Sequence, residues 1–112
     1  MATLAAIRAQ KRAQRLAQLR QGASEAARAH PNGQVWLFGS LARGDWDAYS
    51  DVDLLAIAPS QEQAEALADT LLELAVGDDV LALTTRQWEQ HTTGDDPYWR
   101  AIGRDALRLD GP

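Results

Sequence analysis

The sequence predicts one domain of the α+β class, a two-layer arrangement in which a small mixed β-sheet is flanked by helices. Helical and strand patterns follow one another in the order α-β-β-α-β-α-α, with neither an internal repeat nor a linker between them. The length of 112 residues, with 46% hydrophobic and 24% charged residues, suits a single compact core. Residues 1–112 are therefore expected to form one domain.

The first expected element is a long helix over residues 2–29. This segment is dominated by Ala, Gln, Arg and Leu, which are strong helix formers, and its apolar residues recur at helical spacing along one stripe. The His-Pro-Asn-Gly run at residues 30–33 ends the helix, because proline disfavours a helical residue before it and Asn-Gly favours a turn. A first strand is predicted over residues 34–38.

The middle of the chain predicts a strand, a helix and another strand. Residues 52–58 carry large apolar side chains at both odd and even positions, so we expect a central strand covered on both faces. Ser60 with Gln63 is a capping-box pattern, and apolar residues then recur at helical spacing until Gly77 supplies a stop. The third strand is predicted over residues 80–83.

Two short helices are predicted in the last third of the chain. Thr84 with Gln87 is a second capping-box pattern, which indicates a helix beginning there. Asp96 followed by Pro97 is a helix cap with proline at the first helical position. Both helices would follow the third strand directly.

Charge is distributed unevenly along the chain. The net charge is −5, but residues 1–30 carry six Lys or Arg and one Glu, whereas residues 31–112 carry five Arg and fifteen acidic residues. This acidic majority argues against direct nucleic-acid binding. The basic first helix is most simply a solvated surface, although it could meet an acidic partner.

Composition also limits the compartment and the chemistry. No stretch approaches the roughly 20 uninterrupted apolar residues of a membrane helix, so neither membrane spanning nor secretion is expected and the location is predicted to be cytoplasmic. The chain has no cysteine, which excludes disulfides, thiolate metal sites and a cysteine nucleophile. A bound metal would need oxygen ligands or one of the two histidines.

The histidines and most aromatic residues carry little functional information. Neither His30 nor His91 has a ligand partner at helical or strand spacing, so surface or capping roles are expected for both. Tyr98 is at most an interface residue. Three tryptophans are expected to be buried or half-buried: Trp36, Trp88 and Trp99.

The segment that bears on function begins where the first strand ends. Gly39 and Ser40 open a short helical turn, whose free backbone N–H groups and positive dipole end suit a phosphate. Glycine lets the backbone approach an anion closely, and the Ser40 hydroxyl adds a donor. Asp51 and Asp53 lie two residues apart at a strand start, so their carboxylates are expected to share one face. Because magnesium takes one or two carboxylates together with substrate phosphates, both halves would form a single site.

These residues carry a resemblance to a known family. Gly-Ser at residues 39–40, followed after ten residues by Asp-X-Asp at residues 51–53, resembles the signature of the DNA polymerase β-like nucleotidyltransferases. Residues 39–44 and 50–54 are similar to the motifs of the minimal nucleotidyltransferases, small prokaryotic members often paired with HEPN-domain proteins. The resemblance implies the polymerase β-like nucleotidyltransferase fold, with a C-terminal helix comparable to residues 97–109.

The resemblance also implies roles for particular residues. Asp51 and Asp53 would be catalytic and bind Mg²⁺, with ATP as the substrate whose phosphates the ion bridges. Asp79, ahead of the third strand, is by position the third catalytic and metal-binding carboxylate. Asp78 stays open as an alternative, and so does a plain surface role for both. The nucleotide would be bound by Gly39, Ser40, Arg43, Asp51 and Asp53.

The loop between the two motif halves leaves several roles open. Arg43 would lie near the nucleotide and offset triphosphate charge, but a salt bridge to Asp45 or Asp47 is equally compatible with the sequence. Trp46 and Tyr49 are unusual for the family, whose loop is commonly small and polar. They could stack on a base, contact a partner or pack under the loop.

Two functions remain in competition. In the first, the chain transfers AMP from ATP to a hydroxyl, which the resemblance implies to be a tyrosine of a cognate HEPN toxin, and acts as the antitoxin in a hetero-oligomer with it. The small size supports this enzyme, because a protein partner would supply its own acceptor. In the second, the chain neutralises a HEPN partner by contact alone and keeps a nucleotide pocket without turnover. Nucleic-acid polymerisation is disfavoured by charge and size.

Overall fold

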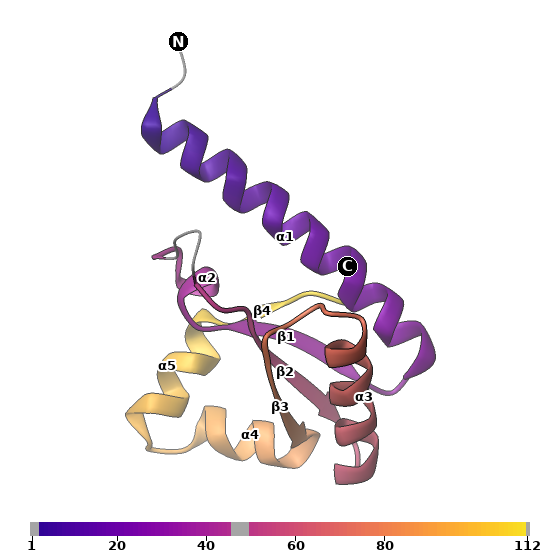
Figure 1. Cartoon of the computed structure of the whole chain (residues 1–112). Helices are drawn as coiled ribbons and strands as arrows, with labels where there is room; N and C mark the ends of the chain where they lie inside the picture. Colours follow the sequence, from indigo (N-terminus) through magenta and orange to yellow (C-terminus); the bar gives the residue numbers. More distant parts are fainter. Residues whose placement is uncertain (1–2, 46–49, 112) are drawn as a thin grey trace.

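The computed structural model describes residues 3–45 and 50–111, which fold around a four-stranded sheet (Figure 1). The order of strands in the sheet is β3-β2-β1-β4, and β1 pairs antiparallel with both β2 and β4, whereas β2 and β3 are parallel. The predicted small mixed sheet is therefore confirmed. The strands are β1 (Gln34–Phe38), β2 (Asp53–Ala58), β3 (Asp79–Thr84) and β4 (Leu107–Arg108).

Helices cover both faces of this sheet, so the domain has three layers rather than the predicted two (Figure 1). On one face lie α1 (Leu4–Ala29) and α3 (Gln61–Glu73), and on the other lie α4 (Thr85–Thr93) and α5 (Pro97–Asp105). The short helix α2 (Ser40–Arg43) follows β1 directly. The first strand was predicted with the observed bounds, because the turn before it and the glycine after it are both local signals.

The two faces of β2 explain its apolar composition. Leu54 and Ala56 pack in the core beneath α1 and α3, whereas Leu55 and Ile57 pack beneath α4 and α5. The second of these cores includes half-buried tryptophans, and the ring centroids of Trp36 and Trp88 lie 5.5 Å apart. The predicted central strand and the predicted half-buried tryptophans are thus both confirmed, and every side chain of β2 after its first is buried.

The apolar contacts of α1 with the core begin at Leu16. Its buried residues are Leu19, Ala23 and Ala26, whereas residues 4–11 are exposed and extend beyond the sheet (Figure 1). The helix starts at a Thr3 cap, where the side chain accepts a hydrogen bond from the Ala6 N–H at 3.0 Å. Among the described helices, none is long and apolar enough to cross a membrane.

The predicted end of the last helix is wrong. Helix α5 ends at Asp105, and residues 107–108 pair with β1 as the edge strand β4. The backbone N–H of Val35 donates to the Asp110 carboxylate at 2.8 Å, across a separation of 75 residues. Such a pairing depends on a distant partner, so no local pattern reveals the strand.

The end of α3 also differs from the prediction. The helix ends at Glu73, and Ala75 adopts a positive φ of 55° two residues before the predicted stop. Gly77 serves another purpose, because a Cβ at this position would lie 2.7 Å from the Leu54 side chain. The glycine signal therefore reflected close packing on β2 rather than termination of the helix.

The remaining helix starts agree with their capping residues. The Ser60 hydroxyl accepts from the Gln63 N–H at 3.2 Å at the start of α3. Thr84 and Gln87 form the complete capping box of α4. Asp96 accepts from the Tyr98 N–H at 2.9 Å, with Pro97 at the start of α5. These caps depend on residues three positions apart or fewer, which is why sequence reveals them.

Candidate active site

The Gly-Ser turn leaves the sheet at the end of β1. Gly39 has φ 80° and ψ −160°, a backbone conformation that is open in practice to glycine alone. Its carbonyl accepts from the Arg43 N–H at 3.1 Å, and Gly44 closes the short helix at φ 90°. The helical turn expected after the first strand is present. As at any helix start, its first backbone N–H groups have no acceptor within α2.

This turn touches the Asp-X-Asp segment. Phe38 is the register partner of Asp53 in the antiparallel pair of β1 and β2. A Cβ added to Gly39 would lie 2.5 Å from Oδ2 of Asp53. The Asp53 carboxylate therefore occupies the space that a side chain at residue 39 would need. The two halves of the motif therefore meet, as their spacing predicted.

Asp79 lies beside Asp53 on the next strand. The two residues are register partners in the parallel pair of β2 and β3, which directs both side chains to the same face of the sheet. That face is the one covered by α4 and α5, because Leu55 and Leu83, at alternate positions of the same two strands, pack beneath these helices. Asp51 precedes β2 and is exposed.

The electrostatics of Asp53 show how closely the acidic residues are grouped. Burial raises the pKa of the Asp53 carboxyl above its ordinary value, and the negative charges of Asp79, Asp51 and Asp78 raise this pKa further. The Arg43 guanidinium acts in the opposite direction. Three carboxylates thus act on a fourth, and one arginine offsets part of their charge.

Asp78 has a structural use that Asp79 lacks. Oδ2 of Asp78 accepts from the Val52 N–H at 2.7 Å, and the N–H groups of Asp78 and Asp79 donate to the Val52 carbonyl at 2.9 and 3.2 Å. The Asp78 side chain therefore holds the backbone just before β2. The register makes Asp79 rather than Asp78 the neighbour of Asp53 on this face, and the identity of the third catalytic carboxylate stays a prediction.

We expect the two aspartates to differ in their effect on stability. Asp78→Ala should lower the free energy of unfolding by about 1–3 kcal/mol, because the part-buried Val52 N–H loses its acceptor. Asp79→Ala should cause no such loss, since its exposed carboxylate only adds like charge near Asp53. Urea unfolding of the two variants measures this difference. Equal destabilisation by both would contradict the assignment.

The acidic group formed by Asp51, Asp53, Asp78 and Asp79 fits a metal ion only when a phosphate ligand also binds that ion. Within residues 3–45 and 50–111, no three His, Asp or Glu side chains are placed to hold a metal ion together. Magnesium needs only one or two carboxylates when phosphates and water complete its shell. Asp53 and its acidic neighbours fit such a partial site, because their combined negative charge would attract a cation. Asp51, Asp53 and Asp79 as a joint metal-binding set stay a prediction.

The raised pKa of Asp53 predicts how stability varies with pH. The folded state binds the Asp53 proton more tightly than the unfolded state does. Ionisation of Asp53 therefore lowers the free energy of unfolding as the pH rises from the ordinary pKa of aspartate through the raised pKa of the folded state. In chelator-containing buffer, Asp53→Asn should therefore raise Tm at pH 7. The gain should vanish on acidification below the ordinary pKa of aspartate.

Thermal unfolding of the wild type and Asp53→Asn over this pH range provides the measurement. Asp69→Asn is the matched control, because Asp69 is an exposed aspartate on α3, on the other side of the sheet. A gain at pH 7 that persists unchanged in acid would show that the effect is not electrostatic. A loss of stability at pH 7 would contradict the predicted sign.

Arg43 forms the predicted salt bridge to Asp45, whereas its role beside the nucleotide stays a prediction. Its Nε lies 3.4 Å from Asp45, and the two side chains are 50% and 64% exposed, so this ion pair contributes little to stability. Arg43 is also close enough to Asp53 to lower its pKa. Asp47, Trp46 and Tyr49 lie outside the described residues, and their alternatives stay open.

Sequence reasoning missed Arg12 as a support of the site. Its guanidinium donates to the Leu41 carbonyl at 3.1 and 3.2 Å and to the Ala42 carbonyl at 3.2 Å. Helix α1 thereby braces α2, and with it the Gly39 turn, from 29 residues away. The basic pattern of the first helix did not distinguish this arginine from the other four in the helix.

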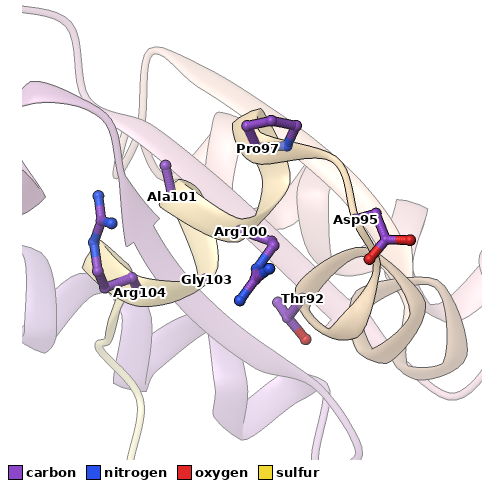
Figure 2. A pocket seen from close by; sticks show the side chains of 7 residues that line it. All are labelled: Thr92, Asp95, Pro97, Arg100, Ala101, Gly103 and Arg104. Carbon is purple, nitrogen blue, oxygen red and sulfur yellow. The ribbon is translucent and has the colours of Figure 1, made fainter.

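Within the described residues, a large groove and a small cavity border α5. The larger, of about 670 Å³, is a groove between α4 and α5, where Arg100 lies close to Thr92 and the turn at Asp95 and Pro97 closes one end (Figure 2). None of its lining residues belongs to the motif. The smaller cavity, of about 100 Å³, does include motif residues and was not expected from the sequence. It is lined by Phe38, Gly39, Arg43, Tyr98, Ala101, Ile102 and Asp105.

His30 has the expected capping role, whereas His91 makes a ring contact that the sequence did not predict. His30 is the C-cap residue of α1, and its Nε2 lies 2.8 Å from the Thr70 hydroxyl on α3. The His91 ring stacks on Trp99, with centroids 4.0 Å apart. These contacts explain both residues as links between helices.

Comparisons with known proteins agree with this geometry. Residues 16–95 match the family model of the nucleotidyltransferase domain, a range that includes the Gly-Ser turn and all four aspartates. The fold is similar to a solved structure from Sulfolobus solfataricus that is described as a "putative nucleotidyltransferase", with a TM-score of 0.62 and 20% identity. That match covers 90% of this chain and 84% of the other. No curated protein matches the chain.

Proposed function

The chain belongs to the nucleotidyltransferase domain family, and from this premise we propose that it transfers AMP from ATP to a tyrosine hydroxyl of a cognate HEPN-domain toxin, as its cytoplasmic antitoxin. Nucleotidyl transfer in general follows from the family. The acceptor and the biological role are our proposal. The observation that carries the catalytic part is the contact between the Gly39 turn and the Asp53 carboxylate.

The residues of the site support the following division of roles. The Gly39 turn receives the triphosphate of ATP, and Arg43, half exposed beside it, offsets part of the phosphate charge. Asp51 and Asp53 would hold Mg²⁺, which supplies charge neutralisation to the phosphates when it is bound. The acidic group repels a bare triphosphate, so nucleotide and ion are expected to bind together.

The transfer step needs a base for the acceptor hydroxyl. The hydroxyl oxygen forms a bond to the α-phosphorus, the bond from that phosphorus to the bridging oxygen breaks, and pyrophosphate leaves. The acceptor proton goes to a carboxylate, and Asp79 is exposed and on the same face as Asp53. Its position on the edge strand β3 leaves room for a protein partner to present the hydroxyl.

Neutralisation by contact alone is the second candidate. The observation in its favour is that no three potential ligands converge on a metal position in the part of the chain that is described. Against it stands the grouping of Asp53 with three other acidic residues, since a domain used only for contact has no need of this mutual repulsion. Mass spectrometry of the partner can distinguish the two candidates.

The test is incubation of each purified variant with the HEPN partner, ATP and Mg²⁺, followed by the mass of the partner and by growth of cells expressing both proteins. The wild type should add one or more AMP groups and protect the cells. Asp79→Asn should bind the partner but neither modify it nor protect, while the control Asp69→Asn should do both. Protection without a mass gain would establish the contact-only candidate and overturn the enzyme.

A further inference from the structure

The smaller cavity beside α5 opens directly from the Gly39 turn. Gly39 and Arg43 line it together with residues of α5. Phe38, its floor on β1, is the register partner of Asp53, so the cavity lies on the same sheet face as the carboxylates. A ligand held at the turn and Asp53 would therefore reach this cavity without crossing the sheet.

The lining of the cavity is mainly apolar and includes two aromatic rings. Phe38 and Ile102 are half-buried and pack in the core beneath α4 and α5. Tyr98, by contrast, is 64% exposed although it lines the cavity, so its ring is available to a ligand. An apolar space with an exposed ring suits a flat aromatic group.

Asp105 gives the cavity a polar edge. Its carboxylate is 29% exposed and lies 3.3 Å from Nε of Arg104, which leaves further oxygen lone pairs to accept hydrogen bonds. A carboxylate accepts from the exocyclic amino group of adenine, guanine or cytosine. Uracil has no exocyclic amino group and would place a carbonyl oxygen against the Asp105 carboxylate.

We propose that this cavity is the nucleobase subsite, with Tyr98 as the stacking surface and Asp105 as the acceptor that selects a base with an amino group. The inference rests on the proposed function, since it concerns the nucleotide bound at Gly39 and Asp53. It adds a base-binding role for α5, and it assigns Tyr98 to the nucleotide. The occupant follows from continuity, because Gly39 and Arg43 belong to both the turn and the cavity.

The experiment compares two probes, Mg·ATP and Mg·tripolyphosphate, by calorimetry on the full chain. Tripolyphosphate has the phosphates but no base. Tyr98→Ala should weaken ATP binding by about tenfold, as expected for loss of one stacking contact, and leave tripolyphosphate binding within about twofold. Tyr98→Phe, which keeps the ring, should restore most of the ATP affinity.

Two further variants complete the design. Ala101 lines both the cavity and the larger groove, so Ala101→Phe should narrow the cavity and weaken ATP binding more strongly than Tyr98→Ala. Arg100→Gln, at a residue that lines the larger groove and not this cavity, should leave the binding of both probes unaffected. Asp105→Asn should narrow the difference in affinity between ATP and UTP, because asparagine also offers a donor to a carbonyl oxygen. Circular dichroism checks that each variant is folded.

The outcomes separate this inference from the proposed function. If Tyr98→Ala and Ala101→Phe bind ATP like the wild type, or lose ATP and tripolyphosphate to the same extent, the base is not bound here and the inference is overturned while nucleotide binding stands. If the wild type binds neither probe, the proposed function fails and the subsite with it. Selective loss of ATP affinity supports the subsite.

Discussion

Asp53→Asn is expected to lower the rate of nucleotidyl transfer by at least about a hundredfold, which corresponds to about 2.7 kcal/mol of transition-state stabilisation. Asparagine keeps the size of the side chain and removes the charge that would hold Mg²⁺ at the phosphates. Asp53 is the member of the acidic group that lies against the Gly39 turn and is also the register partner of Asp79. Its replacement therefore affects the centre of the site.

The measurement is the initial rate of AMP incorporation into the partner at saturating Mg·ATP. Asp69→Asn serves as the control for loss of one aspartate, because it is exposed on α3 and remote from the site face. The Asp53→Asn variant should remain folded, since removing the charge of residue 53 relieves its repulsion with the neighbouring carboxylates. A transfer rate within a fewfold of the wild type would remove Asp53 from the catalytic assignment.

Gly39→Ala is expected to reduce transfer by about a hundredfold as well, for a steric reason. The added Cβ would lie 2.5 Å from Oδ2 of Asp53, and a φ of 80° with ψ near −160° is costly for alanine, by about 1–3 kcal/mol. Either the turn or the carboxylate must move. Both lie where the phosphates and the ion would bind.

Gly44→Ala separates the two causes. Gly44 also has a positive φ, of 90°, but nothing lies within 4 Å of an added Cβ. This variant should lose about 1–2 kcal/mol of stability through backbone strain, yet retain far more activity than Gly39→Ala. Thermal unfolding and transfer rates of the two variants give the comparison. Equal losses of activity would show that contact with Asp53 is not the reason for glycine at residue 39.

Local signals predicted most of the fold. The cap at Asp96 with Pro97, the capping box of Thr84 and Gln87, and the bounds of β1 all depend on residues near one another in sequence. Errors occurred where a distant partner decides the outcome. Residues 107–108 form a strand because β1 offers them an edge, and Gly77 is needed because Leu54 lies against it.

The sequence by itself predicted that Gly39 and Asp53 belong to one site, since a phosphate-binding turn and a carboxylate pair together suit magnesium bound to a phosphate. Only the tertiary structure distinguished Asp79 from Asp78, because the strand register places Asp79 beside Asp53 whereas the Asp78 carboxylate accepts a hydrogen bond from the Val52 N–H. The third catalytic carboxylate stays a prediction. It also brought Arg12 to α2 and placed Tyr98 and Gly39 in the lining of one cavity. These arrangements join residues that lie far apart in the chain. Each side chain could have contacted many other residues, so the spacing of residues in the sequence does not predict them.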